Sequence, residues 1–272
     1  MINRVIKENN INYTPVWFMR QSGRHLKDYI HLRNKHKTFI EFCLNEKSVE
    51  EATLLPLKHY KLDALILFSD ILLVPWVLGQ KVEFIKNFGP KLRPLDLSDK
   101  IITSDFDLMK LNSISNAIKK IKVKSPKSLD LIGFSGAPWT LACYMIEGGG
   151  SKNFEKIRKI LWANDKWVFK LIKKLTSSVC DFLEFQAKSG ADVLMIFDTW
   201  SHMIPYDFWK DFAITPVKEI IIELRKRKIF CPVIGFPFKA GEKLIEYSYE
   251  SEVDVISIDW NTSLKWVLNN IN

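Results

Sequence analysis

Two arginines lie close together near the amino terminus, in the segment Arg20-Gln21-Ser22-Gly23-Arg24. Thirty-two of the forty basic residues are lysines, so the eight arginines are expected where a planar, forked cation is needed rather than a point charge. A guanidinium meets a carboxylate through two parallel hydrogen bonds. A glycine between the arginines lets the backbone approach a ligand closely. The segment is therefore a candidate site for a carboxylate ligand.

Acidic or small polar residues also follow several apolar runs directly. Polar residues at the carboxyl ends of parallel strands gather at one rim of a (β/α)8 barrel, where such barrels hold their active sites. Asp70 ends such a run, so it should be partly buried and should need a cationic or hydrogen-donating partner. The alternative for Asp70 is a helix N-cap. The four places are Phe68-Ser69-Asp70, Phe134-Ser135-Gly136, Phe197-Asp198-Thr199 and Ile258-Asp259.

The elements that would position these residues alternate along the chain. Short, nearly charge-free apolar runs indicate strands buried on both faces, and the amphipathic stretches between them indicate helices. Strand and helix in repetition predict a single-domain α/β fold. A doubly wound sheet fits too, but no GxGxxG or GxxxxGK[ST] loop follows any strand, and the polar strand ends favour a barrel. The expected strands are residues 16–19, 64–68, 129–134, 192–197, 230–236 and 253–258, and the expected helices are 48–59, 151–161, 167–189, 206–228 and 241–250.

Composition narrows the class of protein. The chain has 272 residues, of which 47% are hydrophobic and 26% charged, which is typical of a globular protein. No run approaches the roughly 18 apolar residues that span a bilayer, and the first residues lack the apolar core of a secretory signal. The four cysteines are far apart and in no CxxC pair, so neither a disulfide framework nor a zinc knuckle is indicated. These features predict a cytoplasmic protein.

The net charge of +9 raises the possibility of nucleic-acid binding. The lysines are scattered rather than gathered with arginines and aromatic residues into one footprint, so we expect no nucleic-acid partner. Solvated helix faces account for most of them. A general positive field would still attract a polyanionic small molecule.

Six segments, in order along the chain, resemble the uroporphyrinogen decarboxylase family. The first reads TPVWFMRQSGRHLKDY, the second LILFSDIL, the third LIGFSGAPWTLACYMIEGG and the fourth MIFDTW. The last two, FPFKAG and SIDW, are weaker. Their positions are residues 14–29, 65–72, 131–149, 195–200, 236–241 and 257–260.

This resemblance implies a (β/α)8 barrel that is usually a homodimer and uses no metal or organic cofactor. It also implies a reaction: loss of the four acetate carboxyl groups of uroporphyrinogen III to give coproporphyrinogen III, in porphyrin and heme biosynthesis. Protonation of a pyrrole carbon makes the ring an electron sink for the departing carbon dioxide. Such an enzyme needs cations for the other carboxylates and a fixed negative charge near the pyrrole nitrogens.

The resemblance also implies roles for particular residues. Asp70 is the expected catalytic group, because a carboxylate facing four pyrrole N–H groups would stabilise the positive charge that develops on the ring. The expected substrate-binding residues are Arg20, Gln21, Ser22, Gly23, Arg24, Tyr144 and Thr199. Asp198 and Asp259 are expected to hold loops or helix caps instead.

The family pattern continues past the last matched segment, so the resemblance implies that about six of eight barrel units are present and that the last two strands are lacking. An impaired or non-catalytic porphyrinogen-binding remnant is therefore an alternative. Zinc-dependent methyl transfer, known from relatives on the same barrel, is a further one. It is disfavoured because Cys231 is isolated and no histidine–cysteine pair has ligand spacing.

Overall fold

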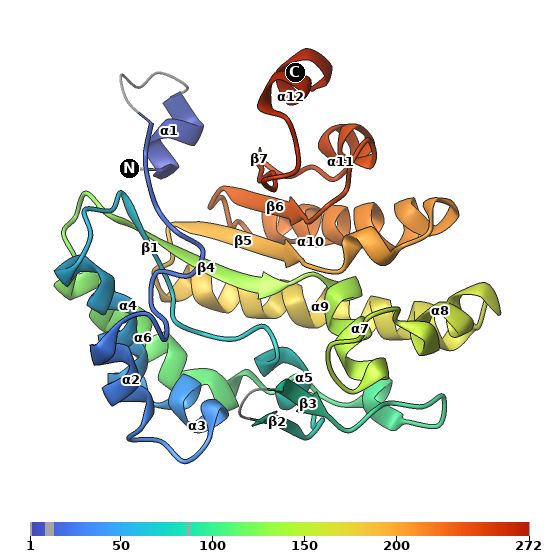
Figure 1. Ribbon diagram of the computed structural model, residues 1–272, viewed down its shortest axis with the longest axis horizontal. Helices are drawn as coiled ribbons and strands as arrows, with labels where there is room; N and C mark the ends of the chain where they lie inside the picture. Colours follow the sequence, from blue (N-terminus) through green and yellow to red (C-terminus); the bar gives the residue numbers. More distant parts are fainter. Residues whose placement is uncertain (1, 9–13, 86–87, 272) are drawn as a thin grey trace.

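A computed structural model describes residues 2–8, 14–85 and 88–271. Its centre is a five-stranded sheet in which every neighbouring pair is parallel (Figure 1). The parallel α/β fold expected from the sequence is thus confirmed. The strand order is β1 (Ala64–Ile66), β4 (Asp130–Gly136), β5 (Val193–Asp198), β6 (Val233–Pro237) and β7 (Val255–Ile256).

Five of the six expected strands are present, and the expected strand at residues 16–19 is wrong. Val16 contacts Asp63, the residue before β1, without forming a strand: its N–H donates to Asp63 Oδ2 at 2.7 Å, and its carbonyl accepts from the Asp63 N–H at 2.9 Å. Val16, Phe18 and Met19 are also exposed, unlike side chains of a sheet covered on both faces. No pairing joins β1 to β7 in the part of the chain that the structure describes, so the sheet is open there, in keeping with the incomplete barrel expected from the sequence.

Helices cover the outer face of the sheet, and a short antiparallel hairpin of β2 (Val82–Ile85) and β3 (Gly89–Leu92) lies beside α5 (Figure 1). The expected helix at residues 206–228 is broken into a 3₁₀ turn, a π-helical turn and α10, whose first turn contains Pro216. The helices are α1 (Ile2–Glu8), α2 (Lys27–Arg33), α3 (Phe39–Leu44), α4 (Glu46–Leu54), α5 (Leu73–Val77), α6 (Asn112–Lys124), α7 (Pro138–Glu147), α8 (Glu155–Trp162), α9 (Lys166–Ser189), α10 (Thr215–Lys226), α11 (Lys243–Glu250) and α12 (Leu264–Asn270).

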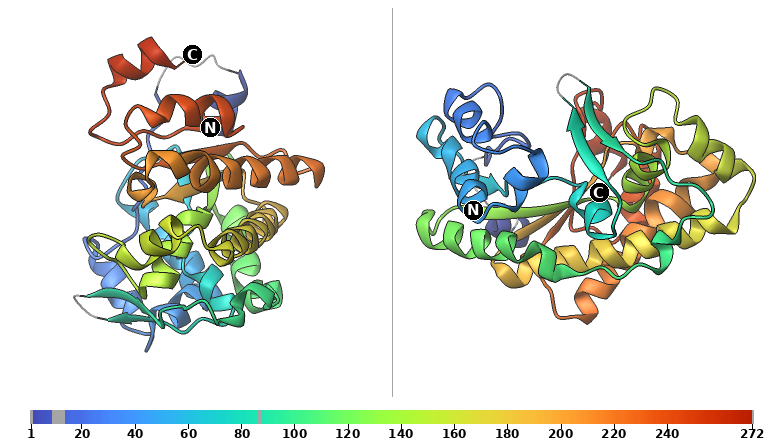
Figure 2. Two further views of the ribbon diagram at one scale, coloured as in Figure 1. Left: turned by 90° about the vertical axis from the view of Figure 1, so that its right-hand side faces the viewer. Right: turned by 90° about the horizontal axis from the view of Figure 1, so that it is seen from below.

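The longest helix, α9, shows how the sequence sets these boundaries. Asp165 caps its amino end by accepting a hydrogen bond from the Trp167 N–H at 2.8 Å. Gly190 follows its last residue with a φ of 121°, which a residue with a β-carbon rarely adopts. Its buried face packs on β4, α7 and α10, so it supports the middle of the sheet (Figure 2).

The inner face of the sheet has its own apolar cluster, separate from the core under the helices. Ile66, Ile132, Met195 and Ile234 are among its buried members. Helix α1 closes the amino end of this face, where the Asn3 N–H donates to Asp130 Oδ2 at 2.8 Å. The carboxyl end of the same face is therefore the end where a ligand could enter.

Candidate active site

Four phenylalanines form a floor at the carboxyl end of the inner face. Phe134 and Phe197 have ring centroids 5.4 Å apart, Phe197 and Phe236 are 6.2 Å apart, and Phe236 and Phe238 are 5.8 Å apart. The first two pairs are edge-on and the third is tilted, and packed rings of this kind make a rigid apolar surface. None of the four is among the site residues expected from the sequence. The expected strands 129–134, 192–197 and 230–236 each end in a phenylalanine, and this repetition is the sequence signal for the floor.

Asp70 lies just beyond β1, at the same rim. Its Oδ1 accepts a 2.8 Å hydrogen bond from the Leu72 N–H, but Leu72 rather than Asp70 is the N-cap of α5. Its Oδ2 has no hydrogen-bond partner in the described residues. Burial raises the pKa of Asp70 to about 6, against the opposing effects of the Leu72 N–H and the Arg20 guanidinium. Asp70 is therefore an ionised carboxylate near neutral pH with one oxygen left for a ligand.

Arg20 and Arg24 are both exposed, on the segment that leads into α2. Neither has a carboxylate partner among the residues that the structure describes. Arg20 lines a shallow pocket of about 290 Å³ with Phe18, His25 and Tyr60. This pocket combines a cation with apolar walls, which suits a carboxylate on an apolar ligand.

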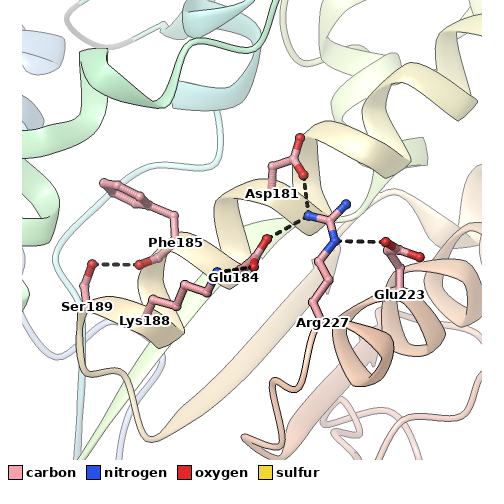
Figure 3. A network of polar contacts seen from close by, with 7 residues as sticks. All are labelled: Asp181, Glu184, Phe185, Lys188, Ser189, Glu223 and Arg227. Atoms are coloured by element: carbon pink, nitrogen blue, oxygen red, sulfur yellow. Dashed lines mark hydrogen bonds and ion pairs between the residues drawn. The ribbon is translucent and has the colours of Figure 1, made fainter.

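Other arginines of the chain are committed to the fold. Arg227, just past α10, contacts Asp181 and Glu184 of α9 at 2.6 and 2.7 Å, and Glu223 at 2.9 Å (Figure 3). These acids raise the pKa of Arg227. Arg225 likewise contacts Asp254 at 2.6 Å. In contrast, Arg20 and Arg24 have no carboxylate partner within residues 2–8, 14–85 and 88–271, so they are available to a ligand.

The Gln21 side chain forms hydrogen bonds with the edge strand β1. It is almost fully buried, its amide nitrogen donates to the Ala64 carbonyl at 2.8 Å, and its amide oxygen accepts from the Ile66 N–H at 3.3 Å. The side chain thus occupies the free edge of β1 in place of a neighbouring strand. The adjoining Ser22 hydroxyl is buried and has no hydrogen-bond partner in the described part of the chain, and Gly23 is buried. A ligand at this segment would therefore meet the backbone and Ser22 rather than the Gln21 amide.

Tyr144 and Thr199 reach the rim from α7 and from the end of β5. Both are partly buried, and the Thr199 hydroxyl has no hydrogen-bond partner within the described ranges. Burial raises the pKa of Tyr144; the Trp200 indole opposes this, and the Asp70 carboxylate adds to it. Asp70 is therefore close enough to Tyr144 to act on it electrostatically. The Tyr144 and Trp200 rings pack edge to face, with centroids 5.9 Å apart.

The other two strand-end acids hold loops. Asp198 points away from the floor, and its Oδ1 accepts a 2.6 Å hydrogen bond from the Thr140 hydroxyl of α7. Burial raises its pKa to about 7, with Thr140 and Lys243 opposing the shift. Asp259 accepts hydrogen bonds from the Lys239 and Asn261 N–H groups, each at 2.8 Å. Their positions agree with the structural roles expected from the sequence.

Two buried hydroxyls near the rim, those of Ser22 and Ser69, lack partners among the described residues. A buried polar atom without a partner costs roughly 1–3 kcal/mol, so such atoms mark places that a ligand or water completes. They lie near Arg20 and Asp70 in sequence and support the same location for the site.

Among residues 2–8, 14–85 and 88–271, no group of three or more histidine, cysteine, aspartate or glutamate side chains is placed to hold a metal ion. The same residues include no helix with the length and apolar character needed to cross a bilayer.

A likeness to a solved structure supports the fold. A methyltransferase from Methanosarcina mazei superimposes with a TM-score of 0.66 over 94% of this chain and 90% of its own, at 14% identity. At that identity the likeness concerns the fold alone.

Other proteins share more sequence identity with this chain than the methyltransferase does. Uroporphyrinogen decarboxylases from Rickettsia africae, Maricaulis maris and Francisella tularensis subsp. mediasiatica are 38%, 37% and 40% identical to this chain. These matches cover 96%, 98% and 95% of this chain, and 75%, 77% and 75% of the relatives. A family model described as uroporphyrinogen decarboxylase (URO-D) matches residues 1–271. The chain belongs to the uroporphyrinogen decarboxylase family.

Proposed function

We propose that this chain is a carboxy-lyase that converts uroporphyrinogen III to coproporphyrinogen III in porphyrin and heme biosynthesis. The observation that carries the proposal is Asp70, a carboxylate at the open end of a phenylalanine-lined sheet. One of its oxygens has no hydrogen-bond partner in the described residues, and it lies within electrostatic reach of Arg20 and Tyr144. The family supports the substrate, and the site supplies a fixed negative charge for the ring and cations for carboxylates that do not react.

The reaction needs a sink for the electron pair of the bond that breaks. Protonation of a pyrrole carbon makes that ring cationic, and the bond between the acetate methylene and its carboxylate then breaks, with its electrons flowing into the ring. Carbon dioxide leaves, the ring carbon gives up its added proton, and the methylene takes up a proton to become a methyl group. The net change is uptake of one proton and loss of one carbon dioxide at each of four acetates.

Asp70 is the group that this mechanism requires at the pyrrole nitrogens. A fixed negative charge there is worth more to the cationic intermediate than to the neutral substrate, so it lowers the barrier. Because the substrate ring is itself the electron sink, the proposal includes no metal and no organic cofactor. Dialysis against a chelator should leave activity unchanged.

The other residues of the rim bind the substrate. Arg20 and Arg24 hold carboxylates that do not react, and Tyr144 and Thr199 donate hydrogen bonds to the same class of group. The backbone around Gln21 and Gly23, with Ser22, completes that side. The phenylalanine floor supports the tetrapyrrole between its carboxylates.

We also propose that the chain forms one uroporphyrinogen decarboxylase-like domain and works as a homodimer. It is cytoplasmic and acts on a small molecule, without nucleic-acid or membrane partners. Exposed apolar side chains near α12, those of Trp260, Leu264 and Leu268, offer surface for a second copy. Light scattering on a sizing column measures the oligomeric state directly.

Anaerobic incubation with uroporphyrinogen III tests the activity. After oxidation, chromatography resolves porphyrins with eight, seven, six, five and four carboxylates. We expect products with seven to four carboxylates from the wild-type chain, loss of product in Asp70→Ala, and weaker substrate binding in Arg24→Gln. Arg93→Gln, which removes an exposed arginine already paired with Asp99, is the matched control and should resemble the wild type.

A folded wild-type chain that binds uroporphyrin but forms no product would refute the proposed activity and leave a binding role. Product formed equally by wild type and Asp70→Ala would retain the reaction but remove Asp70 from it.

A further inference from the structure

Lys239 stands out in the segment that follows β6. Its φ of 57° lies in the left-handed region, which costs a residue with a β-carbon about 1 kcal/mol or more and suits glycine better. The Asp259 carboxylate fixes this conformation by accepting the Lys239 N–H at 2.8 Å. A lysine is therefore present, and its backbone firmly held, at a place where glycine would be unstrained.

The side chain of Lys239 is exposed and has no carboxylate partner in the portions of the chain that the structure describes. Its Nζ lies 5.3 Å from the ring centroid of Phe238, the last phenylalanine of the floor. It also acts on His202: burial lowers the pKa of that imidazole, and the charges of Lys239 and Lys243 lower it further. The cation thus lies over the floor, close to the segment that carries Thr199.

Lys239 is on the opposite side of the rim from the arginine segment. Gln21 ties that segment to β1, whereas Lys239 follows β6, and β4 and β5 lie between. Three strand spacings amount to about 14 Å along the sheet. A tetrapyrrole with carboxylates around its whole edge is of comparable width, so one molecule can meet cations on both sides.

We infer that Lys239 is a second cationic anchor, which binds a carboxylate of the polycarboxylate ligand on the side of the floor opposite Arg20 and Arg24. The identity of that ligand rests on the proposed function. Lys239 makes no bond to a reacting atom in this scheme; it holds the ligand at its far edge. Its loss should therefore raise KM and leave kcat nearly unchanged.

The chain offers a matched control in Lys228, just past α10 at the amino end of β6. Lys228 is exposed and has a φ of 62°, so it shares the backbone conformation of Lys239 at the other end of the strand. Glycine at either position removes a charge and relieves the same strain, so neither variant should fold less well. Denaturant unfolding checks this for each.

The experiment compares Lys239→Gly, Lys239→Arg and Lys228→Gly. Turnover of uroporphyrinogen III gives KM and kcat, and quenching of tryptophan fluorescence by uroporphyrin III, which keeps all eight carboxylates, gives Kd. We expect Lys239→Gly to raise KM and Kd about tenfold, equivalent to about 1.4 kcal/mol. Lys239→Arg should stay within about threefold of the wild type, and Lys228→Gly should equal it.

Equal binding by Lys239→Gly and Lys228→Gly, in a wild-type background that is active, would overturn the inference and leave the proposed function intact. A wild type that neither binds uroporphyrin nor turns over uroporphyrinogen would instead refute the proposed function. A fall in kcat with unchanged KM would also overturn the anchoring role.

Discussion

The Thr140 hydroxyl on α7 donates a 2.6 Å hydrogen bond to Asp198 Oδ1 at the end of β5, across 58 residues of sequence. The same hydroxyl accepts a 3.1 Å hydrogen bond from the Trp200 N–H. Trp139 adds a third hydrogen bond between these segments: its indole N–H donates to the Trp200 carbonyl at 2.9 Å. The start of α7 therefore fixes the loop that carries Thr199 and the Trp200 ring against Tyr144.

Replacement of Thr140 by valine tests the two hydrogen bonds of its hydroxyl. The change keeps the shape of the side chain, but it leaves Asp198 and the Trp200 N–H without their buried partner. We expect a loss of about 1–3 kcal/mol in the free energy of unfolding and a change in tryptophan fluorescence. Thr140→Ser keeps the hydroxyl and should lose about 1 kcal/mol through the missing methyl group. Similar effects of both changes on fluorescence would contradict the role of the hydroxyl.

Asp198 should make stability depend on pH. Its pKa is about 7 in the folded protein and near 3.8 when unfolded, so the folded state holds the extra proton between these values. Stability from this group is therefore present at low pH and lost as pH rises from about 4 to 7. Asp198→Asn removes the titration, and its stability relative to the wild type should improve by roughly 2 kcal/mol or more between pH 5 and pH 8.

Unfolding in urea at both pH values measures this difference. Asp207→Asn changes an exposed aspartate and is a suitable control. Its difference in unfolding free energy from the wild type should be similar at the two pH values. A pH-independent difference between Asp198→Asn and the wild type would show that the carboxylate is not the titrating group.

Asp70→Asn should separate activity from stability. Decarboxylation should fall by about 100-fold or more, because the amide carries no charge to stabilise the cationic ring. The fold should be at least as stable at pH 8, since an ionised Asp70 is disfavoured by burial. In the wild type, kcat/KM should decline as pH falls through about 6, where Asp70 becomes protonated.

The pH profile and urea unfolding of both proteins give these quantities. Asp70→Asn with wild-type kcat/KM at pH 7.5 would remove Asp70 from the chemistry. A decline near pH 6 that persists in the residual activity of Asp70→Asn would assign that ionisation to another group.

Arg227 ties α9 to α10 through three acids (Figure 3). Arg227→Met keeps much of the apolar stem but leaves Asp181, Glu184 and Glu223 without their shared cation. We expect a loss of about 1–2 kcal/mol, since the group is only partly buried. Arg227→Lys should recover part of it, because a point charge cannot serve all three acids in planar geometry. A loss that does not shrink in 1 M salt would argue against an electrostatic origin.

Much of the frame could be predicted from the sequence. The apolar runs predicted all five strands of the sheet, because strands buried on both faces exclude charge. They also placed Asp70 just beyond the carboxyl end of the first of these strands. The same apolar pattern led to the wrong prediction of a strand at residues 16–19. A four-residue apolar run looks alike whether it enters a sheet or lies exposed beside Asp63.

The parts that could not be predicted depend on contacts between distant segments. The Thr140–Asp198 bond joins α7 to β5, and the Lys239 conformation depends on Asp259, twenty residues later. Neither leaves a local pattern. Gln21 is a further case: its type suits a ligand contact as well as a strand edge, and only the position of β1 decides what its amide meets.

Gln21→Leu is the test of that edge. The change leaves the Ala64 carbonyl and the Ile66 N–H of β1 without their side-chain partner, at a buried position, so we expect a loss of about 1–3 kcal/mol in the free energy of unfolding. The neighbouring Ser22→Ala removes a hydroxyl that has no partner in the described residues, and it should change stability by less than about 0.5 kcal/mol. Because β1 leads directly to Asp70, Gln21→Leu should also lower kcat. Hydrogen exchange at the Ile66 amide distinguishes the two roles open to Gln21: faster exchange with lower kcat places it in support of β1, whereas unchanged exchange with a raised KM would make it a ligand contact.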